Sequence, residues 1–382
     1  PLRDVAYKLD TTYQTNLYAG TGGREGNEDV EGQPKPRLRG GTPSNPCRNI
    51  TPVLIDPANL IYQVSDGPGT IEAVYQRGLG GDIEFQSAVG NLYSGSTDAG
   101  KYRTESSSNG LFFQLGSIPE GEITVDATGH FPTAGNQTAL GAILRYIMEE
   151  DVALSSADID ASAWADLDSE YGYEAAIFVG QEAIAADVIN EALAGIGARL
   201  LTTRAGLLRP YVLEPPAIST TTHYGRGQIT KITSLQLPED IGPAAWRIRV
   251  GYARNHTIQT SDLAAAVSEG RRQWLANEWR YGVWSDQTVR ANFEKPGDIT
   301  IPSVLTRKTD AEDVAARLGA LWGVARSLYD VEMGLQPLEQ DIGDTVSLSY
   351  DMVGLRDNPR LGVIVGEQIR SGQGQAIIKV LA

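Results

Sequence analysis

The chain has 382 residues, enough for two or three domains with buried cores. Its 48 aspartate and glutamate residues outnumber 32 lysine and arginine residues, and the net charge of −16 argues against a nucleic-acid groove or a surface for anionic membranes. Hydrophobic residues make up 41% and charged residues 21%, as in soluble globular proteins, and no apolar run is long enough to span a membrane.

Residues suited to catalysis or metal binding are scarce. The single cysteine, Cys47, cannot form an intrachain disulfide or a cysteine cluster. The histidines lie far apart without metal-ligand spacing, at His130, His223 and His256. Phosphate-loop, zinc-protease and serine-hydrolase motifs are absent. We therefore predict no cofactor, no metal site and no catalytic site, and expect that the chain is not an enzyme.

The N-terminal region combines irregular strand material at residues 2–18 with a long segment rich in Gly, Pro, Glu and Arg at residues 19–46. This segment has almost no apolar residues and cannot fold alone, so other surfaces must order it. We expect an assembly arm, with a plain flexible loop as the alternative. The given N-terminus does not show the basic-then-apolar pattern of a signal peptide, and from the start at Pro1 we expect either a removed initiator or the later part of a longer product.

The next part of the chain alternates strands and turns and then becomes helical. Predicted strands cover residues 71–75, 83–85, 111–115 and 122–127. Thr138 is the predicted N-cap of a helix whose apolar face runs to Met148. Four aspartates follow at Asp158, Asp160, Asp166 and Asp168. Paired carboxylates can serve glycoside hydrolysis or calcium binding, but EF-hand spacing is missing and we expect a solvated loop.

The central stretch, residues 173–216, has the pattern of strand, helix and hairpin. A strand is predicted over 175–179, a helix over 181–196, and a hairpin over 199–203 and 207–213. Strands then follow at 228–237 and 245–253, and a helix at 263–279. Thr309 and Glu312 form a capping box for a helix whose apolar face is predicted to reach Leu328. The last predicted strands cover 330–336, 345–350, 361–369 and 375–381.

These elements indicate an α+β, mainly β, multi-domain protein with barrel-like or sandwich β-domains and an inserted α/β module. We predict a β-rich segment at residues 1–137 that carries the Gly/Pro-rich arm (about 19–46). An α/β module at 138–216 and a C-terminal β-domain with two helices at 217–382 complete the predicted division.

Four stretches resemble tail proteins of long-tailed bacteriophages with non-contractile tails, especially the Mu-like transposable ones, and related tail-like particles. These stretches are LRDVAYKLDTTYQTNLYAGTGGREG (2–26), NITPVLIDPANLIYQVSDGP (49–68), WRIRVGYARNHTIQ (246–259) and QDIGDTVSLSYDMVGLRDNPRLGVIVG (340–366). Within that family, the chain resembles the baseplate or tail-tip hub. In related hubs a further part precedes the first stretch, so a first barrel would be incomplete here or completed differently.

The resemblance implies a trimeric ring in the virion tail tip that continues the tail tube, made in the host bacterial cytoplasm. Its partners would be distal tail or tube proteins, the tape measure and receptor-binding fibres, with no stable nucleic-acid binding. Some tail-tip proteins hold an iron–sulfur cluster, but one cysteine cannot supply the ligands. An acidic lumen would let DNA slide without adhering.

A structural assembly protein needs sheet edges and arms that lock neighbouring subunits together. We predict such contacts for residues of the arm because it carries both charge signs, although exposed ion pairs contribute only about 0–1 kcal/mol each. The predicted contact residues are Arg24, Glu25, Pro34, Lys35, Pro36, Arg37 and Arg39.

Three alternatives remain open from the sequence. One is the six-fold distal tail ring. The second is a tail-tip enzyme that hydrolyses cell wall through Asp166 and Asp168. The third is a carbohydrate- or receptor-binding module that uses exposed aromatic residues such as Trp279, Tyr281 and Trp284.

Overall fold

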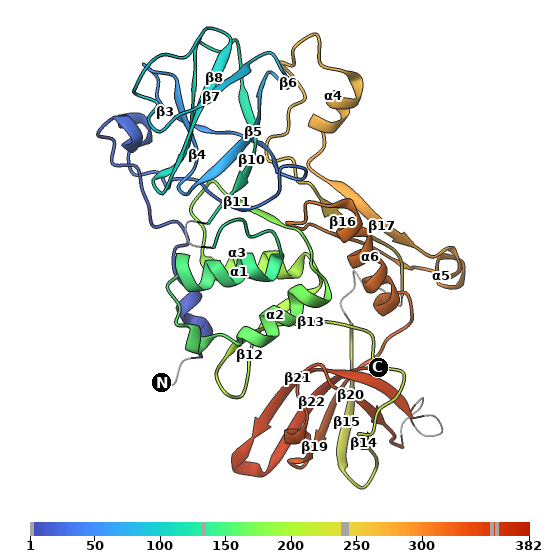
Figure 1. Cartoon of the computed structure of the whole chain (residues 1–382). Coiled ribbons are helices and arrows are strands. Elements are labelled where there is room, and N and C mark those ends of the chain that lie inside the picture. Colours follow the sequence, from blue (N-terminus) through green and yellow to red (C-terminus); the bar gives the residue numbers. More distant parts are fainter. Residues whose placement is uncertain (1–3, 132–133, 238–243, 352–354, 356–358) are drawn as a thin grey trace. The chain divides into compact units, whose positions relative to one another are not determined.

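The computed structural model describes residues 4–131, 134–237, 244–351, 355 and 359–382 (Figure 1). The chain divides into two compact units, each assembled from separate segments. Unit 1 comprises Pro1–Pro210, Gly251–Gly282 and Pro302–Ala311, and unit 2 comprises Tyr211–Val250, Val283–Ile301 and Glu312–Ala382. The predicted class, α+β and mainly β with several domains, is confirmed. The predicted boundaries at residues 137/138 and 216/217 stay a prediction.

Two sheets form the β-rich part of unit 1. The first has the order β11-β1-β10-β5-β6, with β2 also paired to β10. Its strands are β1 Arg37–Gly40, β2 Cys47–Ile50, β5 Gly69–Gln76, β6 Leu79–Gly80, β10 Ile123–Gly129 and β11 Ala176–Val179. The second has the order β3-β4-β9-β8-β7. Its strands are β3 Val53–Asp56, β4 Ile61–Ser65, β7 Glu84–Ala88, β8 Lys101–Ser107 and β9 Gly110–Leu115.

The inward side chains of both sheets form one apolar core. Val64, Phe113 and Val125 come from strands of the two sheets and are fully buried there. Every residue of β10 is buried, so both faces of this strand are covered. Its sequence therefore lacks a clean apolar–polar alternation. The strands predicted near residues 71–75, 111–115 and 122–127 are confirmed.

The predicted arm is ordered by the surface of its own chain. Its first half makes the 3₁₀ turns Gly23–Glu25 and Glu28–Val30, and Val30 packs with Tyr18 against Phe112. Its second half enters the first sheet as β1, between β10 and β11. This end of the segment is therefore a strand rather than loop, because its backbone finds partners far away in the sequence.

Helices cover the other part of unit 1. They are α1 Leu140–Tyr146, which continues as a π turn over Ile147–Asp151, α2 Ala161–Glu170, α3 Ala185–Ala194 and α4 Glu269–Leu275. A two-stranded sheet pairs β12 Ala198–Thr202 with β13 Leu208–Val212, as predicted for the central hairpin. Further 3₁₀ turns occupy Val5–Leu9 and Ser156–Asp158 in unit 1, and Gln336–Glu339 and Ser371–Gln373 in unit 2.

Several local predictions for these helices were wrong. Ala139, not Thr138, is the N-cap of α1, and it makes no side-chain capping bond. The Asp-rich segment expected as a loop contains α2, which Asp160 caps by accepting a hydrogen bond from the Ala163 amide. The helix predicted over 263–279 is shorter, because Ser268 caps α4 and the helix ends before Ala276.

Unit 2 contains a six-stranded sheet and most of a three-stranded sheet, whose strands β16 and β17 each include a few residues of unit 1. The larger has the order β14-β20-β21-β22-β19-β15. Its strands are β14 His223–Tyr224, β15 Ile229–Leu235, β19 Leu328–Met333, β20 Thr345–Leu348, β21 Arg360–Arg370 and β22 Gln375–Leu381. The smaller has the order β17-β16-β18, formed by β17 Arg280–Ser285, β16 Ala245–Tyr252 and β18 Gly297–Ile301.

Two helices accompany these sheets, α5 Gln287–Asn292 and α6 Lys308–Trp322. Trp284 of β17 packs against Gly319 of α6, so the helix approaches the strand closely. The apolar helix face predicted to reach Leu328 stops earlier, because Leu328 already belongs to β19.

Candidate functional site

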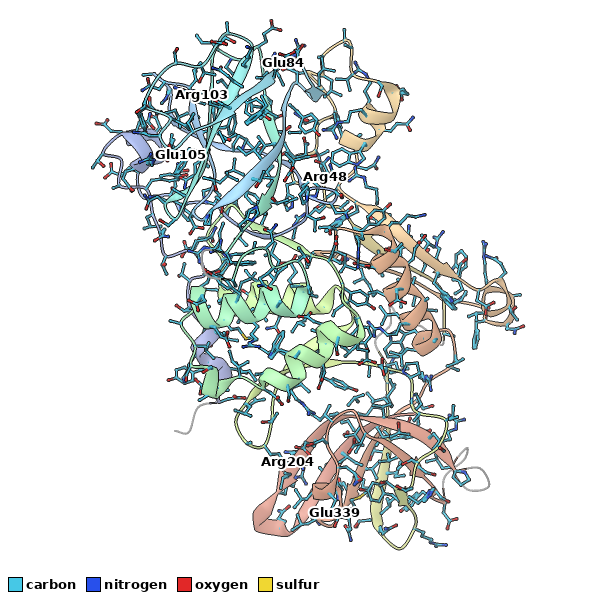
Figure 2. All side chains as sticks on the ribbon, viewed as in Figure 1. Arg48, Glu84, Arg103, Glu105, Arg204 and Glu339 are labelled. Carbon is cyan, nitrogen blue, oxygen red and sulfur yellow. The ribbon has the colours of Figure 1, made fainter. Side chains whose placement is uncertain are left out.

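The predicted contact residues of the arm fall into a partly buried group and a buried group. In the first group, Arg24 pairs at 2.6 Å with Glu105 of β8, which Figure 2 labels, and Lys35 pairs with Glu25 at 2.9 Å. Pro34 forms an isolated β-bridge with Leu17. These residues hold the arm to its own chain, and their contact with another subunit stays a prediction.

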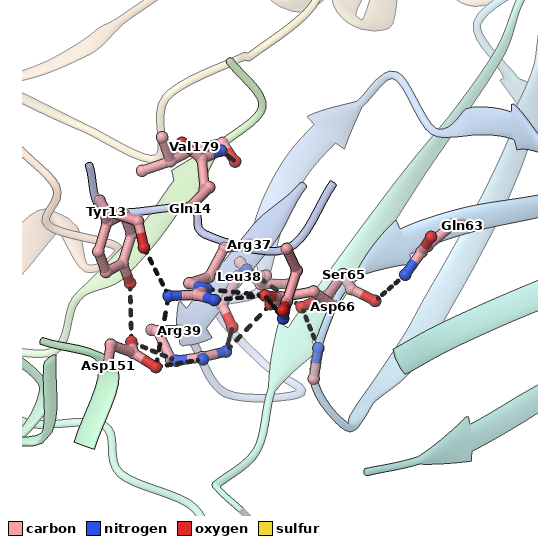
Figure 3. Close-up of polar contacts among 12 residues, drawn as sticks. Tyr13, Gln14, Arg37, Leu38, Arg39, Gln63, Ser65, Asp66, Asp151 and Val179 are labelled. Atoms are coloured by element: carbon pink, nitrogen blue, oxygen red, sulfur yellow. Dashed lines mark hydrogen bonds and ion pairs between the residues drawn. The ribbon is translucent and has the colours of Figure 1, made fainter. Parts of the chain in front are cut away.

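The buried group centres on Arg37 and Arg39, which lie on β1 (Figure 3). Arg37 donates from Nε and Nη2 to Oδ2 of Asp66 at 2.9 and 2.6 Å. Arg39 donates from Nε and Nη2 to the two carboxylate oxygens of Asp151 at 3.1 and 2.8 Å. Both guanidinium groups are consequently occupied inside this chain.

Tyr13 completes this buried charge cluster, defined as Tyr13, Arg37, Arg39, Asp66 and Asp151. Its carbonyl accepts from Arg37 Nη1 at 2.8 Å, and its hydroxyl donates to Asp151 at 3.1 Å. Burial, with the charge of Asp151, raises the pKa of Tyr13 well above its ordinary value, so the hydroxyl remains a neutral donor. The cluster thus contains two cations, two anions and a neutral phenol.

The electrostatics favour the charged forms of both arginines. Burial alone would lower the pKa of Arg37, but hydrogen bonds and charge from Asp66 outweigh burial and raise it. Burial would likewise lower the pKa of Arg39, but the hydrogen bonds and charge of Asp151, with the charge of Asp66, outweigh burial and raise it. Such a cluster can position chain segments. Oδ1 of Asp66 has no hydrogen-bond partner among the described residues, and Nη1 of Arg39 lies 3.9 Å from it. Pro36 adds a carbonyl that accepts from the Asp66 amide at 2.7 Å.

The acidic half of this cluster was missed from the sequence, although one signal was present. Asp151 follows Glu149 and Glu150 at the end of a helix, where the helix dipole disfavours negative charge. That cost indicates a cationic partner elsewhere, and the structure supplies Arg39. Asp66 gives no comparable signal, because aspartate in an Asp-Gly-Pro-Gly turn is ordinary.

A second polar feature of unit 1 is the contact between Cys47 and His256, whose Sγ and Nε2 atoms lie 3.2 Å apart. The pair borders a cavity of about 70 Å³. Other side chains that line this cavity are Phe178, Val188, Glu191, Arg254, Trp279 and Pro302. Burial raises the pKa of the thiol and, with Arg254, lowers the pKa of His256 to about 3. Both groups are therefore neutral near pH 7, unlike an activated thiolate–imidazolium pair.

Acid should destabilise unit 1 through His256. Its pKa is about 3 in the folded chain and near 6.5 in the unfolded chain, so between these values only the unfolded chain is protonated. The free energy of unfolding should therefore fall as the pH falls through this window, and a His256→Gln variant should lack this part of the loss. Urea unfolding of wild type and of His256→Gln at pH 7 and pH 4.5 tests this. If both proteins lose the same free energy of unfolding between the two pH values, the prediction is wrong.

The remaining candidate residues make structural contacts. Asp168 accepts a hydrogen bond from the Gly141 amide of α1 at 2.8 Å, and Asp158 pairs with Lys8 at 2.6 Å. Burial raises the pKa of Asp168. Asp166 is exposed on α2.

The aromatic candidates also participate in packing. The guanidinium carbon of Arg254 lies 5.4 Å from the ring centroid of Trp279, and Trp284 packs on α6. Tyr281 is partly exposed on β17.

Within the described ranges, no three His, Cys, Asp or Glu side chains are grouped as ligands for a metal ion. None of the helices described has both the length and the hydropathy needed to cross a bilayer.

Comparison with known proteins gives a likeness in fold. No family model and no curated protein matches the chain. A chain of the virion of the native gene transfer agent particle is similar with a TM-score of 0.50 and 13% identity, over 92% of this chain and 84% of that chain. A tail protein from Neisseria meningitidis MC58 matches with a TM-score of 0.36 and 11% identity, over 74% of this chain and 78% of that chain. The 43 kDa tail protein of prophage MuSo2 from Shewanella oneidensis matches with a TM-score of 0.37 and 10% identity, over 72% of this chain and 77% of that chain.

Proposed function

We propose that the chain is a structural protein of a bacteriophage tail or tail-like particle, and that it forms the hub at the tail tip. The observation that carries this proposal is the fold shared with a chain of the gene transfer agent virion, because the match extends over 92% of the present chain. The chain would assemble with distal tail or tube proteins, the tape measure and receptor-binding fibres.

Open sheet edges support an assembly role. The six-stranded sheet of unit 2 ends at β14 and β15, and the seven-residue β15 is long enough to pair with a strand of another subunit. In unit 1 the first sheet ends at β11, but this edge is less open, because the Ala176 amide already donates to the Val304 carbonyl at 3.0 Å. Assembly through such edges and through the arm would bury on the order of 2,000 Å² or more per interface.

The proposed role is not catalytic. Cys47 and His256 are both neutral near pH 7, and Asp168 is occupied in holding the start of α1.

Acidic charge is concentrated early in the chain: residues 1–210 contain 28 acidic and 14 basic residues, whereas residues 211–382 contain 20 acidic and 18 basic residues. A channel lined by the acidic part would repel DNA and let it pass.

The native mass tests the hub directly. We expect a trimer of about 123 kDa, three times the 41.1 kDa mass of one chain, by gel filtration with light scattering. A hexamer would instead favour the distal tail ring, and a monomer at every concentration would contradict self-assembly of the chain. Electron microscopy of the trimer should then show a ring with a central channel.

A further inference from the structure

Three arginines of unit 1, Arg271, Arg272 and Arg280, lack an acidic partner in the described part of the chain. Arg272 donates to the carbonyls of Val267 and Ala264 at 3.0 and 2.9 Å. Neither Arg271 nor Arg280 forms an ion pair within the described ranges either, although the chain as a whole is strongly acidic. By contrast, the neighbouring Arg254 pairs with Glu278 and Arg48 pairs with Asp126. These three arginines thus carry positive charge that no ion pair within the described residues neutralises.

Two of these arginines lie against the ring of Trp274. The guanidinium carbons of Arg271 and Arg280 lie 4.4 and 3.8 Å from its centroid, and Arg271 also lies 4.4 Å from the centroid of Tyr75. Arg280 is held by the carbonyls of Ala253 at 3.0 Å and of Trp274. We call Arg271, Arg272, Trp274 and Arg280 the Arg/Trp surface.

The positive charge on this surface is only partly solvated. Burial lowers the pKa of Arg271, and burial with the charges of Arg271 and Arg48 lowers that of Arg280 to about 10. Nη2 of Arg271 is buried without a hydrogen-bond partner. Asp126 also acts on Arg271, but its oxygens already accept from Arg48, the Asn49 amide and the Tyr75 hydroxyl. Arg271 is thus a half-buried cation with one long hydrogen bond, and an incoming carboxylate would offset the free energy that this costs.

An acidic segment of the same unit lies on the opposite flank. Glu28, Asp29 and Glu31 are exposed at the tip of the arm, around the turn Glu28–Val30. In Figure 1 the blue turns of the arm lie at one side of the β-rich part of unit 1, and α4, in orange, lies at the other. Figure 2 agrees, because Glu105, which pairs with Arg24 of the arm, is separated by the sheets from Arg48. One copy therefore cannot bring its own arm tip to its own Arg/Trp surface.

We propose that the Arg/Trp surface binds the acidic arm tip of a second copy of this chain. The inference rests on the proposed function, because it presumes that copies assemble with one another. Arginine and tryptophan are the side chains that most often dominate binding energy at interfaces, and charge complementarity selects an acidic partner. Because the two surfaces lie on opposite flanks, the contact is head-to-tail, which closes into a ring when the rotation between copies permits.

Charge reversal tests this contact in the full chain. Arg271 is suitable because its one hydrogen bond within the chain, from Nε to the Gly78 carbonyl, is long at 3.5 Å. The Arg271→Glu variant and the Glu28→Lys/Glu31→Lys variant should each require about 10- to 100-fold more protein for half-assembly, measured by light scattering over a concentration series. The triple variant restores opposite charges and should recover most of the loss.

Two matched controls separate this effect from misfolding and from net charge. Arg271→Lys keeps the positive charge and should assemble within about threefold of wild type. Arg199→Glu reverses an exposed arginine on β12 and changes the net charge equally, and it should assemble like wild type. Each variant should melt within a few degrees of wild type.

The outcomes distinguish this contact from the hub proposal. If wild type assembles and both reversed variants assemble equally well, the contact is wrong while the hub proposal stands. Loss of assembly without recovery in the triple variant would mean that a different acidic segment occupies the surface, and would also overturn the contact. If wild type stays monomeric at every concentration, self-assembly itself fails, and the contact fails with it.

Discussion

Replacement of Arg37 by leucine should lower the free energy of unfolding of unit 1 by about 3–5 kcal/mol, because it leaves Asp66 buried without its cationic partner. Arg37 supplies two of the three hydrogen bonds that Oδ2 of Asp66 accepts from described side chains, the third being from Asn16, and it also donates to the Tyr13 carbonyl. Arg39 cannot substitute, since its Nη1 lies 3.9 Å from Asp66 and its other nitrogens bind Asp151. The expected loss is a large part of the 5–15 kcal/mol that stabilises a typical domain.

Urea unfolding at pH 7 measures this loss, and a matched control is available on the surface. Lys101 pairs with Asp98 at 3.0 Å, but both side chains are well exposed. Lys101→Met should therefore cost only about 0–1 kcal/mol. A loss for Arg37→Leu as small as that of the control would contradict a stabilising role for the buried cluster. Hydrogen exchange should also become faster along β1, because that strand is the part of the arm that the cluster holds.

Replacement of Gly319 by alanine should destabilise unit 2 by about 1–3 kcal/mol through overpacking. Alanine normally stabilises a helix relative to glycine by about 0.5–1 kcal/mol. At this position in α6, however, a Cβ atom would overlap Cδ2 of Trp284 and lie 2.5 Å from Cε2 of the same ring. The steric cost should reverse the usual sign of the substitution.

Gly270 of α4 is the matched control for this reversal. A Cβ atom there meets nothing within 4 Å, so Gly270→Ala should stabilise the protein slightly or leave it unchanged. Thermal unfolding of both variants gives the comparison, with near-ultraviolet circular dichroism reporting the environment of Trp284. If Gly319→Ala is as stable as Gly270→Ala, then α6 and β17 are not as closely packed as described.

Much of the secondary structure could be predicted because its signals are local. The strand at Ala176–Val179 and the hairpin of β12 and β13 follow from short β-prone runs that end at glycine or at a turn. The predictions failed where short elements depend on particular contacts. Helix α2 was missed because it is rich in aspartate and short, and its stability depends on capping by Asp160 and burial of Trp164.

The candidate site was predicted only in part. Composition directed attention to the charged residues of the arm, but it could not distinguish Arg24, which remains partly exposed, from Arg37, which is buried. It also could not identify the Arg/Trp surface, because an arginine without an acidic partner is recognised only when its neighbours in space are known. That absence of an internal partner, within the described residues, is what makes this surface a candidate for assembly.

The sequence by itself determined the acidic charge, the mainly β class and the positions of most strands, because these depend on composition and on periodicity within a few residues. Only the tertiary structure decided which charges neutralise one another. Arg37 pairs with Asp66, which lies 29 residues away in the sequence, and Arg39 pairs with Asp151, which lies 112 residues away. A charge buried away from water is stable only beside its partner, and which residue becomes that partner depends on how strands and helices pack in three dimensions.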